Sequence, residues 1–303
     1  MAEFTAADAA FTGFRLVWER PLSVLYWAAL QLVAALGYVL FVTLSAGKAF
    51  TNAAQVSLQF NADPGPLMAA LAPIAPTYLV VILAFLVLSA VLYAAMNRAV
   101  LRPERSSFGY LRLASDELRQ LGLLALLAGM AIALYFAIVL AAAVVLTLLA
   151  LVVGDIGMVL GLVVVVPMTL VAFIYFGVRF SLASPMTFDR GRIDVLGSWR
   201  LTRGRFWPLF VAYLLAFALS LVVWALTIAI AIFAVAILGG GFGAIAQGAE
   251  ENFDSLAAAF TPARGLYLTV AAAGTALRLP ITLTPPATIY RALTGAAAGR
   301  AFD

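Results

Sequence analysis

Residues 121–151 read LGLLALLAGMAIALYFAIVLAAAVVLTLLAL, and this stretch decides the fold. It contains no Asp, Glu, Lys or Arg. A helix needs about 20 consecutive apolar residues to cross a hydrocarbon core roughly 30 Å thick. The stretch therefore predicts a transmembrane helix. Because it is too long for one perpendicular crossing, we expect this helix to tilt or to extend past the interface.

Similar apolar stretches occur along the whole chain. Hydrophobic residues make up 65% of the 303 residues and charged residues only 11%, whereas soluble domains are about 25% charged. The sequence predicts an all-α integral membrane protein, a single membrane domain over residues 1–303. The six predicted transmembrane helices cover residues 21–44, 76–97, 121–151, 157–183, 206–238 and 265–293.

The basic residues predict how the helices are oriented. Of the 18 basic residues, 17 are Arg, and with the N-terminus inside, 15 of the 18 fall in cytoplasmic segments. Cytoplasmic loops carry the excess of Lys and Arg in membrane proteins. We therefore expect both termini to be cytoplasmic, in a bacterial inner membrane.

The absent residue types limit the chemistry. The chain has no Cys and no His, which excludes thiolate nucleophiles and imidazole ligands or bases. Carboxylates do not cluster within the spans, so we expect no enzyme, no cofactor and no metal. The basic balance fits membrane orientation and anionic headgroups rather than nucleic acid.

The predicted helices group into three similar units, 1–106, 107–190 and 191–303. Each begins with an amphipathic segment, marked by Phe14-Arg15-Leu16, Leu111-Arg112-Leu113 and Trp199-Arg200-Leu201, and continues as a hairpin of two spans. Such segments lie in the membrane interface with one face among the headgroups. In the second segment, Asp116 and Glu117 are expected on the polar side, opposite Phe108 and Leu111. The alternative is that aromatic and Arg anchors at one interface produce similar ends without a repeat.

The stretch 178–208 reads VRFSLASPMTFDRGRIDVLGSWRLTRGRFWP. It resembles the membrane domain associated with bacterial glycerophosphodiester phosphodiesterases, which also occurs alone in six-span proteins. The residues that carry the resemblance are Arg179, Ala183, Pro185, Asp189, Ser198, Trp199, Leu201, Thr202, Gly204, Phe206 and Trp207. Two departures are Asp189, where the family usually has Glu, and Pro208, where it often has Arg. The resemblance is specific over about 30 residues and extends by topology to the rest.

This resemblance implies membrane residence and a lipid-related role. The sequence contains no soluble phosphodiesterase domain, so the family's catalytic activity does not carry over to this chain.

Aromatic and basic residues in this stretch are candidates for binding a phospholipid or lipid phosphate. Trp prefers the headgroup region, and Arg pairs bidentately with phosphate. The candidates are Arg179, Trp199, Arg200, Arg203, Arg205 and Trp207. The alternative is that these residues are generic interfacial anchors that enforce the topology.

The sixth predicted helix contains a second candidate site. Arg278 lies fourteen residues after Arg264 and thirteen before Arg291, which predicts a position near mid-membrane, where a charge is costly and usually functional. Pro280, Pro285 and Pro286 remove backbone donors just beyond it, and Thr282, Thr284 and Thr288 are expected to help satisfy the freed carbonyls. The alternative is a displaced helix in which Arg278 reaches the interface or pairs within the bundle.

Together these features predict a non-enzymatic, lipid-associated membrane protein that serves as a scaffold or accessory subunit of a larger assembly. The alternative is a transporter or channel for a small anionic or lipid-derived substrate, working through the broken sixth helix around Arg278. The expected partners are phospholipids and a protein bound at the outer loop 45–75.

Overall fold

A computed structural model describes residues 5–58, 65–104, 107–239, 241, 243 and 252–295. Its regular structure over these residues is helical, with no strand, and six helical segments are long and apolar enough to cross a membrane. The elements in chain order are α1 (Ala6–Glu19), α2 (Pro21–Leu58), α3 (Gly65–Leu71), the 3-10 helix η1 (Ala72–Ile74), α4 (Ala75–Leu101), the 3-10 helix η2 (Ser107–Tyr110), α5 (Ser115–Val153), α6 (Asp155–Phe180), α7 (Ala183–Arg190), α8 (Val195–Leu201), α9 (Phe206–Leu238), α11 (Leu256–Ala259), α12 (Pro262–Leu283) and α13 (Pro285–Thr294). The six predicted spans are confirmed as helices. Arg105, Arg300 and part of the predicted outer loop, residues 59–64, lie outside the described residues.

Three boundaries differ from the prediction. The fourth span ends at Phe180, and residues 183–190 form the separate helix α7. The sixth span is two helices, α12 and α13, which meet at Thr284 directly before Pro285 and Pro286. The stretch 45–75 was predicted as a loop, but its described residues are almost entirely helical, because α2 continues beyond a kink at Ala46.

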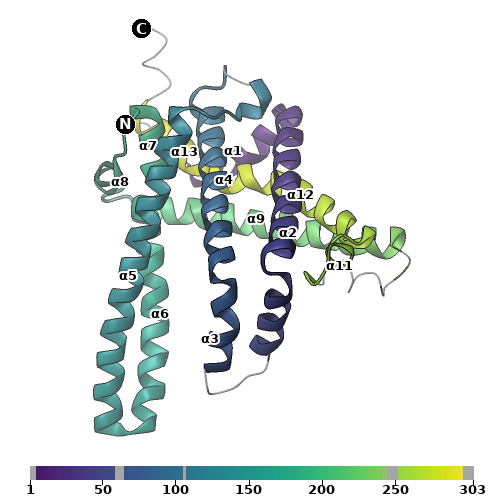
Figure 1. The fold of residues 1–303 in the computed structure, drawn as a ribbon. Helices are drawn as coiled ribbons and strands as arrows, with labels where there is room; N and C mark the ends of the chain where they lie inside the picture. Colours follow the sequence, from purple (N-terminus) through teal and green to yellow (C-terminus); the bar gives the residue numbers. More distant parts are fainter. Residues whose placement is uncertain are drawn as a thin grey trace.

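The long helices follow two directions. In Figure 1, α2, α4, α5 and α6 run along one direction, while α9 and α12 cross them steeply. No single membrane normal is parallel to both sets, so at least one set is tilted in a bilayer. The 33 residues of α9 span about 50 Å at 1.5 Å per residue, enough to cross a hydrocarbon core of about 30 Å at a tilt.

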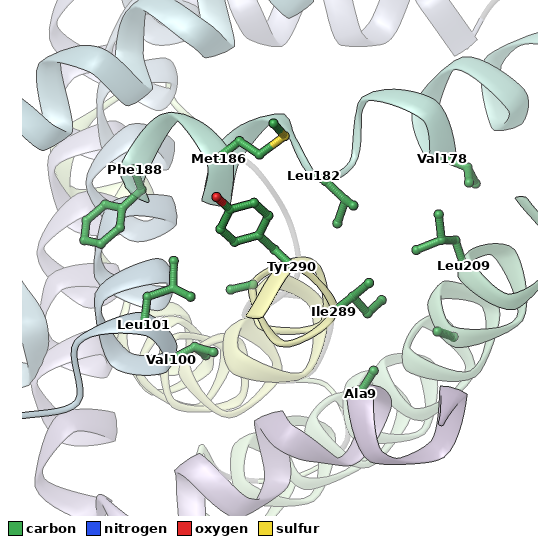
Figure 2. Packing of buried hydrophobic residues seen from close by; sticks show 12 residues of the cluster. Ala9, Val100, Leu101, Val178, Leu182, Met186, Phe188, Leu209, Ile289 and Tyr290 are labelled. Atoms are coloured by element: carbon green, nitrogen blue, oxygen red, sulfur yellow. The ribbon is translucent and has the colours of Figure 1, made fainter. Parts of the chain in front are cut away.

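One end of the molecule carries α1, α7, α8, α13 and the connection 102–114 (Figure 1). Most of the arginines belong to these segments or to adjoining helix ends, so we call it the arginine-rich end. Its core is built around α13, whose Ile289 and Tyr290 are surrounded by apolar side chains of four other segments (Figure 2). They come from α1, α4, α9 and the α6–α7 region, and are Ala9, Val100, Leu101, Val178, Leu182, Met186, Phe188 and Leu209. The break at Thr284 thus places α13 at the centre of this core.

Helix α1 uses its small residues to pack on the protein. Ala9, Ala10 and Gly13 are buried, and a Cβ at Gly13 would lie 2.5 Å from backbone atoms of Pro280 and Ile281. The aromatic residues Phe11 and Trp18 are exposed. An aromatic face turned outward beside an Arg-rich end fits the predicted interfacial segment.

The second predicted amphipathic segment is not a separate helix. Residues 107–110 form one 3-10 turn, residues 111–114 are not helical, and α5 begins at Ser115. Phe108 and Tyr110 have positive φ values of 50° and 64°, a region that non-glycine residues rarely adopt. The third unit begins with a single short helix, α8, and the second unit ends with an extra short helix, α7.

Candidate functional site

The stretch 178–208 forms a compact connection at the arginine-rich end. It contains the end of α6, the helices α7 and α8, and the first residues of α9. Two hydroxyl groups of α8 and its C-terminal turn join it to α6: Ser198 Oγ and Thr202 Oγ1 donate to the carbonyl oxygen of Arg179 at 2.8 and 3.3 Å. Residues four apart on a helix lie on the same face, which explains how both reach one carbonyl.

The Arg179 side chain faces aromatic rings rather than the surface. Its guanidinium carbon lies 4.9 Å from the centroid of the Trp199 ring and 5.3 Å from that of Tyr175. Both Nε and Nη2 donate to the Tyr175 hydroxyl at 3.2 Å. Cation–π contacts of this kind contribute about 0.5–2 kcal/mol. Arg179 and Trp199 are therefore brought together, and their contact helps to hold α8 against α6.

The start of α8 is fixed by Asp194. Its carboxylate accepts a hydrogen bond from the Gly197 N–H at 2.7 Å and pairs with Arg190 at 2.5 Å. Burial raises the pKa of Asp194, but the bonds from Gly197 and Arg190 outweigh it, so the pKa lies below its ordinary value. The carboxylate therefore stabilises the folded α8 while it is ionised.

Asp194→Ala is expected to destabilise α8 by about 1 kcal/mol, the usual cost of losing an N-cap side chain. Hydrogen exchange of residues 195–201 at pH 7 measures this loss, and Asp194→Asn is the control because Asn also caps helices. Since the folded-state pKa is lowered, the wild type's advantage over Asp194→Ala is full above the unfolded pKa of about 3.9. It is lost as the pH falls through the folded pKa. An advantage that persisted in strong acid would contradict this role.

The remaining candidates of this stretch differ in exposure. Arg200 and Arg203 are exposed, and their guanidinium groups make no hydrogen bond or ion pair within the described ranges. Trp207 is 70% exposed and Leu196 74%. Arg205 is half-buried and donates to the Leu201 carbonyl at 3.3 Å. We call Leu196, Arg200, Arg203 and Trp207 the α8 surface, which combines exposed cations with exposed apolar side chains.

The structure also contains a buried ion cluster that the sequence analysis missed. Arg98 of α4 is 2% exposed and pairs with Glu117 of α5 at 2.7 Å. Asp116 lies 3.6 Å from both Arg98 and Arg102, and 2.6 Å from Arg119. The prediction that Asp116 and Glu117 lie on the polar outer side of an interfacial helix is wrong, because residues 115–121 belong to α5 and these carboxylates face α4.

A neutral polar cluster lies in the same region. Asn97 Nδ2 donates to Ser184 Oγ at 2.8 Å, and Ser184 Oγ donates to Gln120 Oε1 at 3.0 Å. Gln120 Nε2 in turn donates to the Ser184 carbonyl at 2.9 Å. All three side chains are buried. In the sequence, these three residues are recognisable only as an amide or a hydroxyl near the end of an apolar stretch. The structure shows that α4, α5 and α7 bring them together.

The residues around Arg278 form a separate site. Arg278 is half-buried in α12, five positions before its end, and its guanidinium group forms no hydrogen bond or ion pair with the part of the chain that the structure describes. Thr282 Oγ1 donates to the carbonyls of Arg278 and Leu279, and Thr284 Oγ1 to that of Pro280. The carbonyl that Pro280 leaves without its usual donor is that of residue 276, so the prediction that these hydroxyls replace it is wrong. Such back-bonds favour a bend instead.

Comparison with known proteins gave no match: no family model, no curated protein and no solved structure is similar to this chain.

Proposed function

We propose that the protein is a non-enzymatic, lipid-associated protein of the bacterial inner membrane, with its arginine-rich end in the cytoplasm and anionic phospholipid bound at the α8 surface. The six long apolar helices are those of an integral membrane protein. The orientation rests on the excess of arginine at one end, as positive residues favour the cytoplasmic side. The resemblance of residues 178–208 to a lipid-related membrane domain agrees with this proposal.

The α8 surface is the observation that carries the proposal. Arg200 and Arg203 have unpaired guanidinium groups within the described residues, and apolar surface is exposed by Leu196, four residues before Arg200 on α8, and by Trp207 at the start of α9. Arg binds phosphate through two parallel hydrogen bonds, and Trp favours the headgroup level. The contacts of Arg179 and Asp194 hold α8 in a fixed position, which reduces the entropy cost of binding.

A specific phosphate site needs the two parallel N–H groups of an arginine side chain, whereas a residue that only anchors the protein to the membrane surface needs no more than positive charge. Arg200→Lys/Arg203→Lys keeps both charges but loses bidentate pairing. We expect this variant to retain phosphatidylglycerol about threefold to tenfold less than wild type, in line with the net loss of one hydrogen bond of ordinary strength. Native mass spectrometry from nanodiscs of phosphatidylglycerol and phosphatidylcholine measures the retained lipid.

Two further variants complete this experiment. Arg200→Ala/Arg203→Ala/Arg205→Ala should retain no more phosphatidylglycerol than the lysine variant. Lys48→Ala removes one exposed positive charge from α2 beyond its kink, and should behave as wild type. Wild-type retention in the lysine variant would show that the arginines act only as general positive charge.

The alternative of transport rests on Arg278 as an unpaired, half-buried cation in a broken helix. Arg278 lies at the centre of the candidate span Pro262–Thr294, five residues before α12 ends at Leu283. The scaffold role and the partner at residues 45–75 remain predictions.

A further inference from the structure

A cavity of about 320 Å³ lies between α4, α5 and α6, and the α8 surface does not line it. Its walls are mainly apolar, with Leu124, Leu127, Met130 and Leu134 from α5 and Phe173 and Phe176 from α6. Three lining residues have hydroxyl groups, namely Tyr93, Ser181 and Ser184. The cavity thus combines a long apolar wall with a small polar region.

Two of the three hydroxyl groups already donate to the protein. Ser184 Oγ donates to Gln120, and Ser181 Oγ donates to the Val178 carbonyl at 2.8 Å while accepting from Tyr213 at 2.8 Å. These bonds fix both serines, so neither has a proton left for a ligand.

The Tyr93 hydroxyl differs from both serines. It makes no hydrogen bond to any residue in the described ranges. A tyrosine hydroxyl in an apolar site usually has a partner, because an unmade hydrogen bond costs free energy there. The Tyr93 hydroxyl is therefore a donor without a partner among the described residues, beside an apolar cavity. A ligand that satisfies this hydroxyl must offer a hydrogen-bond acceptor.

The lining also limits the charge and size of the occupant. None of the residues that line the cavity is Asp, Glu, Lys or Arg, and an ionised group without a partner is costly to bury. A neutral acceptor such as an ester carbonyl fits these walls. The volume of 320 Å³ lies at the low end of the roughly 300–1,000 Å³ of ligand pockets, which suits one hydrocarbon chain.

We propose that this cavity binds a monoacylglycerol, with its acyl chain along α5 and α6 and its ester carbonyl accepting a hydrogen bond from the Tyr93 hydroxyl. The site goes beyond lipid binding at the α8 surface and uses different residues. It recognises a neutral single-chain ester, whereas the α8 surface recognises a phosphate.

Gly177→Leu tests the cavity directly. Gly177 lines the cavity, and a Cβ there would meet no atom within 4 Å, so the larger side chain enters the cavity and a better helix former replaces glycine. Gly129→Leu is the matched control, since Gly129 is also helical and open but is not a lining residue. Tyr93→Phe removes only the hydroxyl group.

The full-length variants are placed in phosphatidylcholine nanodiscs containing a small fraction of monoolein, and native mass spectrometry measures the bound monoolein. We expect Gly177→Leu to lose it, Gly129→Leu to retain it, and Tyr93→Phe to bind about threefold to tenfold more weakly. Oleic acid, which replaces the ester with a carboxylate at neutral pH, should compete poorly.

Three results would overturn the proposal: wild-type binding by Gly177→Leu, wild-type binding by Tyr93→Phe, or equal competition by oleic acid. The two sites fail independently in these measurements. Arg200→Lys/Arg203→Lys should bind monoolein normally, and Gly177→Leu should retain phosphatidylglycerol normally, so loss at one site is distinguishable from loss at the other.

Discussion

Glu117→Ala is expected to lower the free energy of unfolding by about 3 kcal/mol, the lower end of the roughly 3–5 kcal/mol cost of breaking a buried ion pair. Arg98 and Glu117 are only 2% and 4% exposed and lie 2.7 Å apart. The substitution leaves the Arg98 charge buried with weaker compensation. We place the effect at the lower end because Asp116 and the Tyr110 carbonyl still contact Arg98.

Unfolding by sodium dodecyl sulfate in mixed micelles measures this loss, and a double variant identifies its cause. Arg98→Met/Glu117→Leu removes both charges, so it should recover most of the stability lost in Glu117→Ala, since apolar replacement of a buried pair is often neutral. A double variant as unstable as the sum of the two single variants would show that packing, not the uncompensated charge, causes the loss.

Trp27→Ala should produce a loss of similar or larger size, roughly 3–5 kcal/mol for truncating a large buried aromatic residue. Trp27 of α2 is fully buried, and its Nε1–H donates to the Gly109 carbonyl at 2.7 Å. The truncation opens a cavity in the cluster with Leu16, Met96 and Tyr110. It also releases η2, whose Phe108 and Tyr110 have positive φ values.

Trp27→Phe separates the hydrogen bond from the packing. It retains most of the apolar volume but leaves the Gly109 carbonyl without its donor, a loss of about 1–3 kcal/mol. Hydrogen exchange of residues 107–114 should rise in both variants, and more in Trp27→Ala. Unchanged exchange in Trp27→Ala would mean that Trp27 does not hold this connection.

The long apolar helices could be predicted from sequence because a single local property, the run of apolar residues, defines them. The predicted bounds of α9, 206–238, coincide with those observed. Pro285 and Pro286 also marked the break, which the structure places at Thr284, whereas α12 continues through Pro280. Boundaries at the polar ends were less predictable, since helix there depends on contacts between elements: α5 begins six residues earlier than expected, at Ser115.

The buried polar residues could not be assigned from sequence because their partners are distant in the chain. Glu117 and Asp116 fitted a polar face of an interfacial helix until α4 placed Arg98 and Arg102 against them. Arg179 was predicted as a phosphate ligand, and its contact with the Trp199 ring on α8 could not be predicted from the sequence. The cavity lined by Tyr93 could not be predicted either, because it is formed where α4, α5 and α6 meet.

The contact between Gly13 and the backbone at Pro280 and Ile281 has a consequence for biogenesis. The ribosome releases α1 long before α12, so the surface on which α1 packs does not exist while the intervening spans are being inserted. Until α12 has been inserted, the aromatic face of α1 can bind this helix to the membrane surface. Its docking on α12 is therefore a late step of assembly, which can occur only after the final hairpin has been inserted.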